Sequence, residues 1–161
     1  MDNKINLTAA EISLIWRAYM NASLNNTVFT YFKEKVENEE IRPLIDDIFN
    51  VCQDHLGKLK HFLINENHPV PQGLTDEDVN IQAQKLYTDG YMLQHALNFG
   101  MLGMTVMTAA ISSSAREDVY DFFSKGFQDC HAIHHKATQI SLAHGTFVRP
   151  LPFLFQKRWI L

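Results

Sequence analysis

The chain has 161 residues, of which 46% are hydrophobic, 20% charged and 11% aromatic. This length suits one domain with a core large enough to fold alone, and the hydrophobic content excludes an intrinsically disordered chain. There are 14 Lys and Arg residues against 18 Asp and Glu residues, which gives a net charge of −4. Because nucleic-acid binding depends on cationic neutralisation of phosphates, this balance argues against a nucleic-acid partner.

The N-terminus and the cysteine usage indicate the compartment. The opening residues, MDNKINLTAAEI, lack the basic-then-apolar pattern of a signal peptide. The longest apolar stretch, residues 99–111, is shorter than a bilayer span. Two cysteines, Cys52 and Cys130, make no disulfide scaffold and suit a reducing compartment. We therefore expect a soluble, cytoplasmic protein with no membrane partner.

The hydrophobic pattern predicts an all-α chain. No segment alternates apolar and polar residues as a half-buried strand does, whereas four segments repeat apolar residues at helical spacing. The predicted helices cover residues 8–36, 39–66, 86–113 and 115–144. The first begins at a capping box formed by Thr8 and Glu11. The second tolerates Pro43 near its first turn, where a missing amide costs little, and its apolar stripe is centred near Cys52.

The third predicted helix is apolar nearly all round, so it is expected to lie centrally or to meet another subunit. Gly100 and Gly103 permit close approach of a neighbouring backbone there, at some cost in helix propensity. Counting about 100° per residue predicts an inward face centred on His95. The predicted members of that face are Tyr91, His95, Phe99, Leu102 and Val106.

The fourth predicted helix begins at a second capping box, between Ser114 and Glu117. It ends at Gly145, a common helix-stop residue. The remaining residues, 145–161, contain prolines that forbid a regular helix and aromatic side chains that favour burial. We therefore expect an extended tail that packs on the bundle or on a partner.

The connections between the helices predict the topology. Short turns at residues 37–38 and 114–115 join the helices into two antiparallel hairpins. Residues 67–85 are too long for an ordinary loop in a compact domain, but they can run the length of the bundle. The predicted fold class is an all-α, ferritin-like four-helix bundle of two antiparallel helical hairpins joined by a long crossover loop. One domain is expected over residues 1–161.

Helical geometry also predicts a polar layer inside the bundle. Measured from the turn between the last two helices at about 1.5 Å per residue, His95 and His134 fall at one height and face each other. Thiolate and imidazole are the donors that Zn²⁺ prefers. The candidate metal ligands are Cys52, His55, His95, Cys130 and His134. The favoured interpretation is that these are buried groups without a metal, hydrogen-bonded to neighbours such as Tyr19, Ser23 or Tyr91, and the metal site is the alternative.

The residue pattern argues against enzymatic activity. A carboxylate di-iron centre needs Glu residues and Glu-x-x-His pairs, but the nearest spacing here, Cys52-Gln-Asp-His55, has Cys in place of Glu. The sequence also lacks a nucleophile–base pair with an orienting group and a glycine-rich phosphate loop. We therefore predict neither a catalytic activity nor a resident cofactor, the alternative being a divalent metal such as zinc.

Several segments resemble one family. Residues 7–12, LTAAEI, are similar to the opening of the ferritin-like, spore-coat-protein-F-like domains of Bacillus-type bacteria. Residues 69–80, PVPQGLTDEDVN, resemble the most specific segment of that family, the loop Pro-x-Pro-x-Gly-(Phe/Leu)-Thr-x-x-Asp-Val-Asn. The resemblance spans essentially the whole chain as one copy. It implies a spore-coat protein of unknown molecular function and carries over no active-site residue.

Three classes of function remain. The first is a structural or interaction protein associated with the spore or its coat, which the family resemblance and the apolar third helix favour. The second is a bundle that binds a metal or small ligand through the Cys/His layer. The third, a ferritin-like oxidase, is disfavoured by the missing carboxylates. We expect a homodimer, or contact with other coat proteins, that covers part of the third helix or the tail segment Phe153–Trp159.

Overall fold

The computed structural model describes residues 5–149. Within that range it holds four long α-helices, one short 3-10 helix and no strand. These elements are α1 (Ala9–Lys35), α2 (Arg42–Asn65), η1 (Asp76–Asp78), α3 (Asp89–Ser113) and α4 (Glu117–Ala143). The four predicted helices are confirmed to within about three residues at each end. The predicted tail lies mostly outside the described residues.

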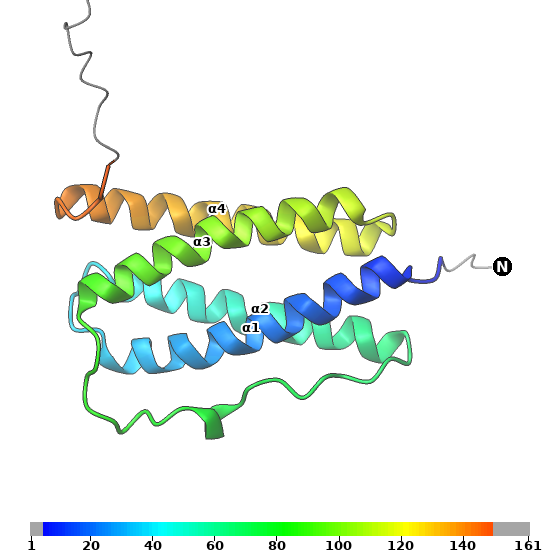
Figure 1. Cartoon of the computed structure of the whole chain (residues 1–161), viewed down its shortest axis with the longest axis horizontal. Coiled ribbons are helices and arrows are strands. Elements are labelled where there is room, and N and C mark those ends of the chain that lie inside the picture. The colour runs from blue at the N-terminus through cyan, green and yellow to red at the C-terminus, as the bar shows by residue number, and fades with distance from the viewer. Residues whose placement is uncertain (1–4, 150–161) are drawn as a thin grey trace, which may run out of the picture.

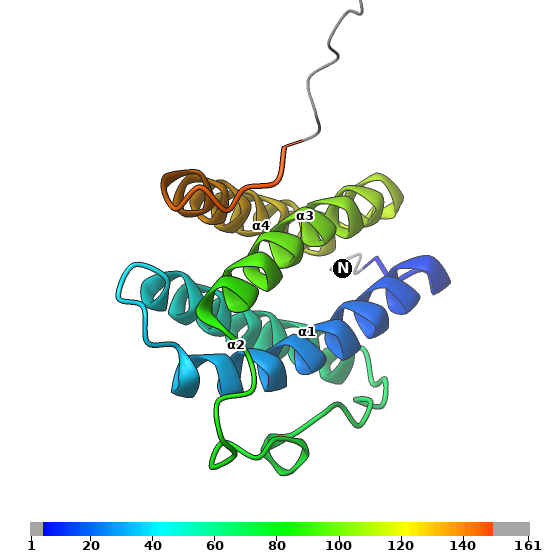
Figure 2. The same cartoon turned by 60° about the vertical axis from the view of Figure 1, so that its left-hand side comes forward.

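The helices form two antiparallel hairpins, α1 with α2 and α3 with α4 (Figure 1). The connection between α2 and α3 runs along the outside of the bundle from one end to the other and carries η1 midway. Turning the molecule shows the α3–α4 hairpin lying across the α1–α2 hairpin (Figure 2). The predicted all-α bundle with one long crossover is therefore confirmed.

The crossover is held against α1 by hydrogen bonds and close packing. The Tyr31 hydroxyl donates to the Gln84 carbonyl at 2.7 Å and accepts from the Leu86 amide at 2.8 Å. A Cβ atom at Gly73 would lie 2.7 Å from Ser23 Oγ, so only glycine lets the loop approach α1 this closely. These contacts fix the crossover against α1 at its two ends, near Gly73 and near Gln84 and Leu86.

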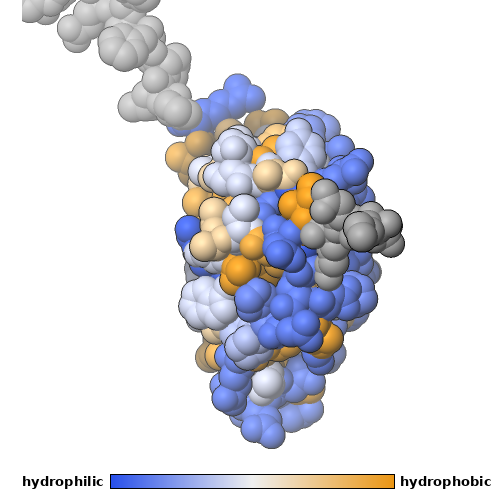
Figure 3. Space-filling model, turned by 90° about the vertical axis from the view of Figure 1, so that its right-hand side faces the viewer, coloured by the Kyte–Doolittle hydropathy of each residue, from blue (hydrophilic) through white to orange (hydrophobic). Residues whose placement is uncertain are grey.

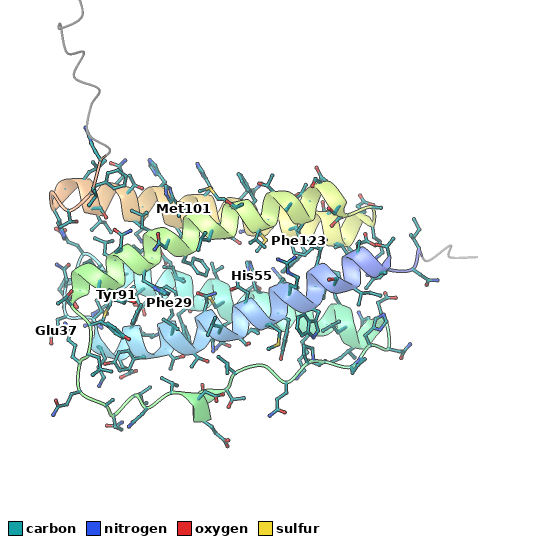
Figure 4. All side chains as sticks on the ribbon, viewed as in Figure 1. Phe29, Glu37, His55, Tyr91, Met101 and Phe123 are labelled. Atoms are coloured by element: carbon teal, nitrogen blue, oxygen red, sulfur yellow. The ribbon has the colours of Figure 1, made fainter. Side chains whose placement is uncertain are left out.

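Two groups of buried apolar side chains fill the bundle. Phe29 belongs to the group near the α1–α2 turn, and Phe123 to the group near the α3–α4 turn (Figure 4). Both rings are almost fully buried. Side chains from both hairpins contribute to each group, and burial of this apolar surface stabilises the contact between the hairpins.

The inward face predicted for α3 is wrong. Tyr91, Leu102 and Val106 are 48%, 59% and 39% exposed, while His95 and Phe99 are half-buried. The buried residues of α3 are Met92, Leu93, Ala96, Leu97, Gly100, Met107 and Ala110. A helix that is apolar nearly all round has no stripe from which its orientation can be predicted.

Two glycines set the orientation of α3 against α4. A Cβ atom at Gly100 would lie 2.7 Å from the backbone nitrogen of His134. A Cβ atom at Gly103 would collide with Cys130 Sγ. The predicted close approach at these glycines is therefore confirmed, and it turns the larger apolar side chains between them outward.

The N-terminus of α1 has the predicted capping box. Thr8 Oγ1 accepts from the Glu11 amide at 3.2 Å, and Glu11 Oε2 accepts from the Thr8 amide at 2.8 Å. Two amides that lack helical partners are thereby satisfied.

The capping box predicted for α4 is wrong. Its N-cap is Arg116, with no side-chain cap bond of its own, and Ser114 Oγ donates to the Ala110 carbonyl instead. The acceptor comes from another helix: Glu11 Oε1 accepts from the amides of Ala115 and Arg116, each at 2.9 Å. One carboxylate therefore serves two helix N-termini, and the local Ser/Glu motif is not used.

Candidate functional site

The two cysteines lie in the core between α2, α3 and α4. Cys52 and Cys130 are 2% and 1% exposed. Burial raises the pKa of each thiol to about 12, and the proximity of Cys130 adds to the shift at Cys52. Both are neutral thiols at neutral pH. Uncharged and closely packed, they act as small core side chains rather than nucleophiles.

His55 lies on α2 and faces α4 (Figure 4). Its side chain is 6% exposed, and its ring packs edge-on against Phe122 with 5.3 Å between centroids. Its Nε2 atom is 3.8 Å from Asp129 Oδ2. Burial lowers the pKa of His55, and the Asp129 carboxylate only partly opposes this shift. The imidazole is therefore neutral at pH 7.

His55 lines a cavity of about 580 Å³ between α2 and α4, called here the α2–α4 cavity. Carboxylates, ammonium groups and aromatic rings surround it. Its lining residues are Asp54, His55, Gly57, Lys58, His61, Phe62, Asp118, Asp121, Phe122 and Lys125. Ion pairs occupy part of this polar lining, since Lys58 binds Asp54 at 2.7 Å.

His95 and His134 lie in different surroundings. The His95 ring packs edge-on against Phe32 of α1, with 5.3 Å between centroids, and burial lowers its pKa. His134 is half-buried on α4 with its backbone against Gly100. The candidate ligands thus lie in four places. Cys52 and Cys130 lie in the core and His55 lies beside the α2–α4 cavity. His95 lies among the aromatic rings of α1, and His134 lies against Gly100. Within residues 5–149 no group of three or more His, Cys, Asp or Glu side chains is placed to hold a metal ion. The zinc site stays a prediction.

The outer side of α3 presents an apolar strip to solvent. This strip, called here the α3 face, comprises Met101, Leu102, Thr105, Val106 and Ala109, all of which are exposed. Met101 and Leu102 are 44% and 59% exposed. Residues 90–113 include no Asp, Glu, Lys or Arg. Their polar side chains are His95, two amides and several hydroxyl groups. The sequence predicted that this helix lies centrally or meets another subunit, and it assigned Leu102 and Val106 to the inward face.

The hydroxyl groups on and beside the α3 face are turned back to their own helix. Thr105 Oγ1 donates to the Met101 carbonyl at 3.2 Å, and Thr108 Oγ1 donates to the Met104 carbonyl at 2.9 Å. With these donors satisfied, the threonines can leave water without losing a hydrogen bond. The face can therefore be covered by another apolar surface at little polar cost.

Among the described helices, α3 alone is long and apolar enough to cross a membrane by length and composition. The mean hydropathy of its 18-residue window is 1.3, and 28% of that window is buried in the bundle. Core helices of water-soluble proteins pass the same test, so this composition does not assign α3 to a membrane. By contrast, the end of the molecule that carries the α3–α4 turn shows apolar side chains interspersed with polar ones (Figure 3).

Over residues 5–149 the fold is a four-helix bundle in which the α3 face is exposed to solvent. The chain belongs to the DUF3231 family, a family of proteins of unknown function, whose model matches residues 1–158. No curated protein matches the chain.

Two solved structures share the fold. One is a "putative spore coat protein" from Bacillus halodurans C-125, with a TM-score of 0.79 and 18% sequence identity over 91% of this chain and 94% of that chain. The other is a conserved hypothetical protein from Mycobacterium tuberculosis, with a TM-score of 0.69 and 10% identity over 84% of this chain and 99% of that chain. At these identities the likeness is one of fold.

Proposed function

We propose that this protein is a non-catalytic structural component associated with the spore or its coat, and that it self-associates through the α3 face. The spore association is supported by the similarity in fold to the Bacillus halodurans protein and by the coat-type loop at residues 69–80. The neutral, buried state of its two thiols supports a non-catalytic role.

The observation that carries the proposal is the exposure of the α3 face on a helix that has no Asp, Glu, Lys or Arg after Asp89 in its first turn. Fully burying an exposed leucine is worth roughly 1.5–3 kcal/mol, and covering Leu102, which is 59% exposed, contributes part of that value. A second copy of the chain offers the same uncharged strip, and a two-fold contact pairs each residue with its equivalent. Small residues such as Thr105 and Ala109 let two such helices approach closely.

The oligomeric state of the full chain tests self-association. We expect light scattering to give a dimer for the wild type and a monomer for Leu102→Glu, because the substitution would bury two carboxylates in the contact. Leu24→Glu is the matched control, since Leu24 is 50% exposed on α1 and lies outside the α3 face. A wild-type chain that stays monomeric at high concentration would contradict the proposal.

The spore association is tested separately. Proteins extracted from the coat of purified spores of the source organism should include this chain, as detected by a specific antibody. Detection only in vegetative cells would contradict the association and leave the self-contact to be judged by light scattering.

A further inference from the structure

The α2–α4 cavity has the size and the aromatic wall of a small-molecule site. Its volume of about 580 Å³ falls within the range of about 300–1,000 Å³ that ligand pockets occupy. His55 and Phe62 each pack edge-on against Phe122, with 5.3 and 5.8 Å between ring centroids. These contacts hold the rings in place before anything binds. A preformed apolar wall of this kind loses little conformational freedom on binding.

Gly57 keeps one side of the cavity free of side-chain atoms. It lies in the interior of α2, where glycine lowers the helix propensity relative to alanine. A Cβ atom at Gly57 would meet nothing within 4 Å, so no contact of the fold requires a glycine there. This differs from Gly103, where a Cβ atom would collide with Cys130 Sγ. The absence of a side chain at Gly57 therefore leaves room in the cavity and not for a neighbouring helix.

The charges around the cavity favour a cationic ligand. Most of them are already paired within the protein: Lys58 with Asp54, Lys125 with Asp129, and Asp118 with Arg116. Asp121 is exposed at the cavity and forms no ion pair with any other residue of 5–149. Since both lysines of the lining are neutralised, the uncompensated charge is the Asp121 carboxylate. An ammonium group is its natural partner.

The His55 ring has unused hydrogen-bonding capacity beside the aromatic wall. Its side chain is 8% exposed and faces α4 (Figure 4). Its Nε2 atom is 3.8 Å from Asp129 Oδ2, which is beyond hydrogen-bond distance, and within residues 5–149 no other group bonds to the ring nitrogens. Buried polar groups normally have a partner, and a neutral imidazole has one donor and one acceptor nitrogen. A ligand ring that carries an N–H or O–H group can donate to this acceptor.

We propose that the α2–α4 cavity binds a small aromatic amine. The ammonium group of the ligand lies beside Asp121, its ring packs against Phe62 and Phe122, and a donor on the ring bonds to His55. No residue of α3 lines the cavity, so self-association through the α3 face leaves it open. The binding and the proposed function therefore stand or fall separately.

Titration of the ¹⁵N-labelled full chain with tryptamine, followed by NMR, tests the proposal. Tryptamine combines an ammonium group with a ring that carries an N–H donor. We expect saturable shifts of the amides around Gly57 and Phe122, with a Kd below about 1 mM. Indole-3-acetate has the same ring and the opposite charge, so it should bind about threefold or more weakly.

Three outcomes of the titration would overturn the proposal. One is the lack of saturable shifts at a tryptamine concentration about tenfold above the expected Kd. Another is saturable binding whose shifts lie away from the residues that line the cavity. The third is binding of indole-3-acetate as tight as that of tryptamine, because the uncompensated carboxylate would then not select a cation.

Filling the space beside Gly57 tests the location. We expect Gly57→Leu to weaken tryptamine binding about tenfold or more, while the melting temperature shows that the chain still folds. Gly90→Leu is the matched control, since a Cβ atom there meets only Thr88 Oγ1, at 3.9 Å, and Gly90 lies outside the cavity. Equal affinities of Gly57→Leu and the wild type would overturn the assignment of the cavity.

Removal of the unpaired carboxylate tests the orientation of the ligand. We expect Asp121→Asn to weaken tryptamine binding roughly threefold, the effect of losing one exposed ion pair. The exposed position of Asp121 makes this variant safe for the fold. Asp76→Asn, at an exposed carboxylate of η1 outside the cavity, should leave the affinity unchanged. An Asp121→Asn chain that binds tryptamine as tightly as the wild type would overturn the placement of the ammonium group.

Discussion

Glu11 Oε1, in the first turn of α1, accepts a hydrogen bond from the backbone amide of Arg116, the N-cap residue of α4, at 2.9 Å. The two residues are far apart in the sequence and belong to different hairpins. Arg116 in turn donates to Glu66 at the end of α2, with 2.7 Å between Nη1 and Oε1. Three helix ends therefore meet at Glu11 and Arg116, which joins the two hairpins at a point where the helices lack internal hydrogen bonds.

Replacement of Glu11 should destabilise the whole fold. Burial opposes its ionisation, but the amides of Arg116, Thr8 and Ala115 and the Thr8 hydroxyl together hold the pKa of Glu11 at about 2. Its side chain is 1% exposed. At pH 7 we expect Glu11→Gln to lower the free energy of unfolding by about 2–3 kcal/mol, measured by urea denaturation.

The lowered pKa of Glu11 also predicts that the free energy of unfolding depends on pH. Because the pKa of Glu11 in the folded state is below its ordinary value of 4.5, the stabilisation is complete above pH 4.5 and is lost as the pH falls toward 2. The difference between wild type and Glu11→Gln should shrink over that range. Glu117→Gln serves as the control, since the exposed Glu117 belongs to the unused capping motif and its loss should cost less than about 1 kcal/mol. A larger effect at Glu117 would contradict the assignment of the cap.

Two Gly→Ala substitutions should change stability in opposite directions. Gly103→Ala places a Cβ atom against Cys130 Sγ, so we expect a loss of about 1–3 kcal/mol from overpacking. Gly57→Ala on α2 meets nothing within 4 Å and should add about 0.5–1 kcal/mol through better helix propensity. Thermal unfolding followed by circular dichroism measures both changes. If Gly103→Ala also raises the melting temperature, α3 and α4 are not in the close contact described.

Buried histidines should make the protein less stable in mild acid. Burial lowers the pKa values of His55 and His95 below the ordinary histidine value of 6.5. The unfolded chain therefore takes up protons near pH 6.5 before the folded chain does, and stability falls as the pH drops below that value. The urea midpoint should decrease between pH 7.5 and 5.5, and it should decrease less in His55→Gln with His95→Gln. An unchanged pH dependence in this double variant would assign the effect to other groups.

Zinc binding by the predicted Cys/His layer has a direct test. We expect the chain purified without an affinity tag to contain substoichiometric zinc by mass spectrometry, because binding would have to remove protons from thiols whose pKa values are about 12. One equivalent of zinc that is lost in Cys130→Ala and bound more tightly at higher pH would instead support zinc binding by the Cys/His layer. Cys130→Ser preserves the side-chain volume more closely and controls for a packing defect.

The helices and their order could be predicted from the sequence because the signals are local. The capping box at Thr8 and Glu11, the stop at Gly145 and the short turns between paired helices depend on residues only a few positions apart. The long crossover follows from the length of the remaining segment. Backbone hydrogen bonding and apolar periodicity act over the same short range, so the sequence alone determined the four-helix, two-hairpin architecture.

Only the tertiary structure decided which sides of the helices face inward and which groups meet across the bundle. An all-round apolar α3 carries no stripe, so its rotation was set by the contact of Gly100 and Gly103 with α4. That rotation exposed Leu102 and brought His95 beside α1 rather than to the centre of the core. The cap of α4 likewise came from Glu11 rather than from the neighbouring motif. Side-chain volume and long-range hydrogen bonds select among orientations that helical periodicity alone leaves equivalent.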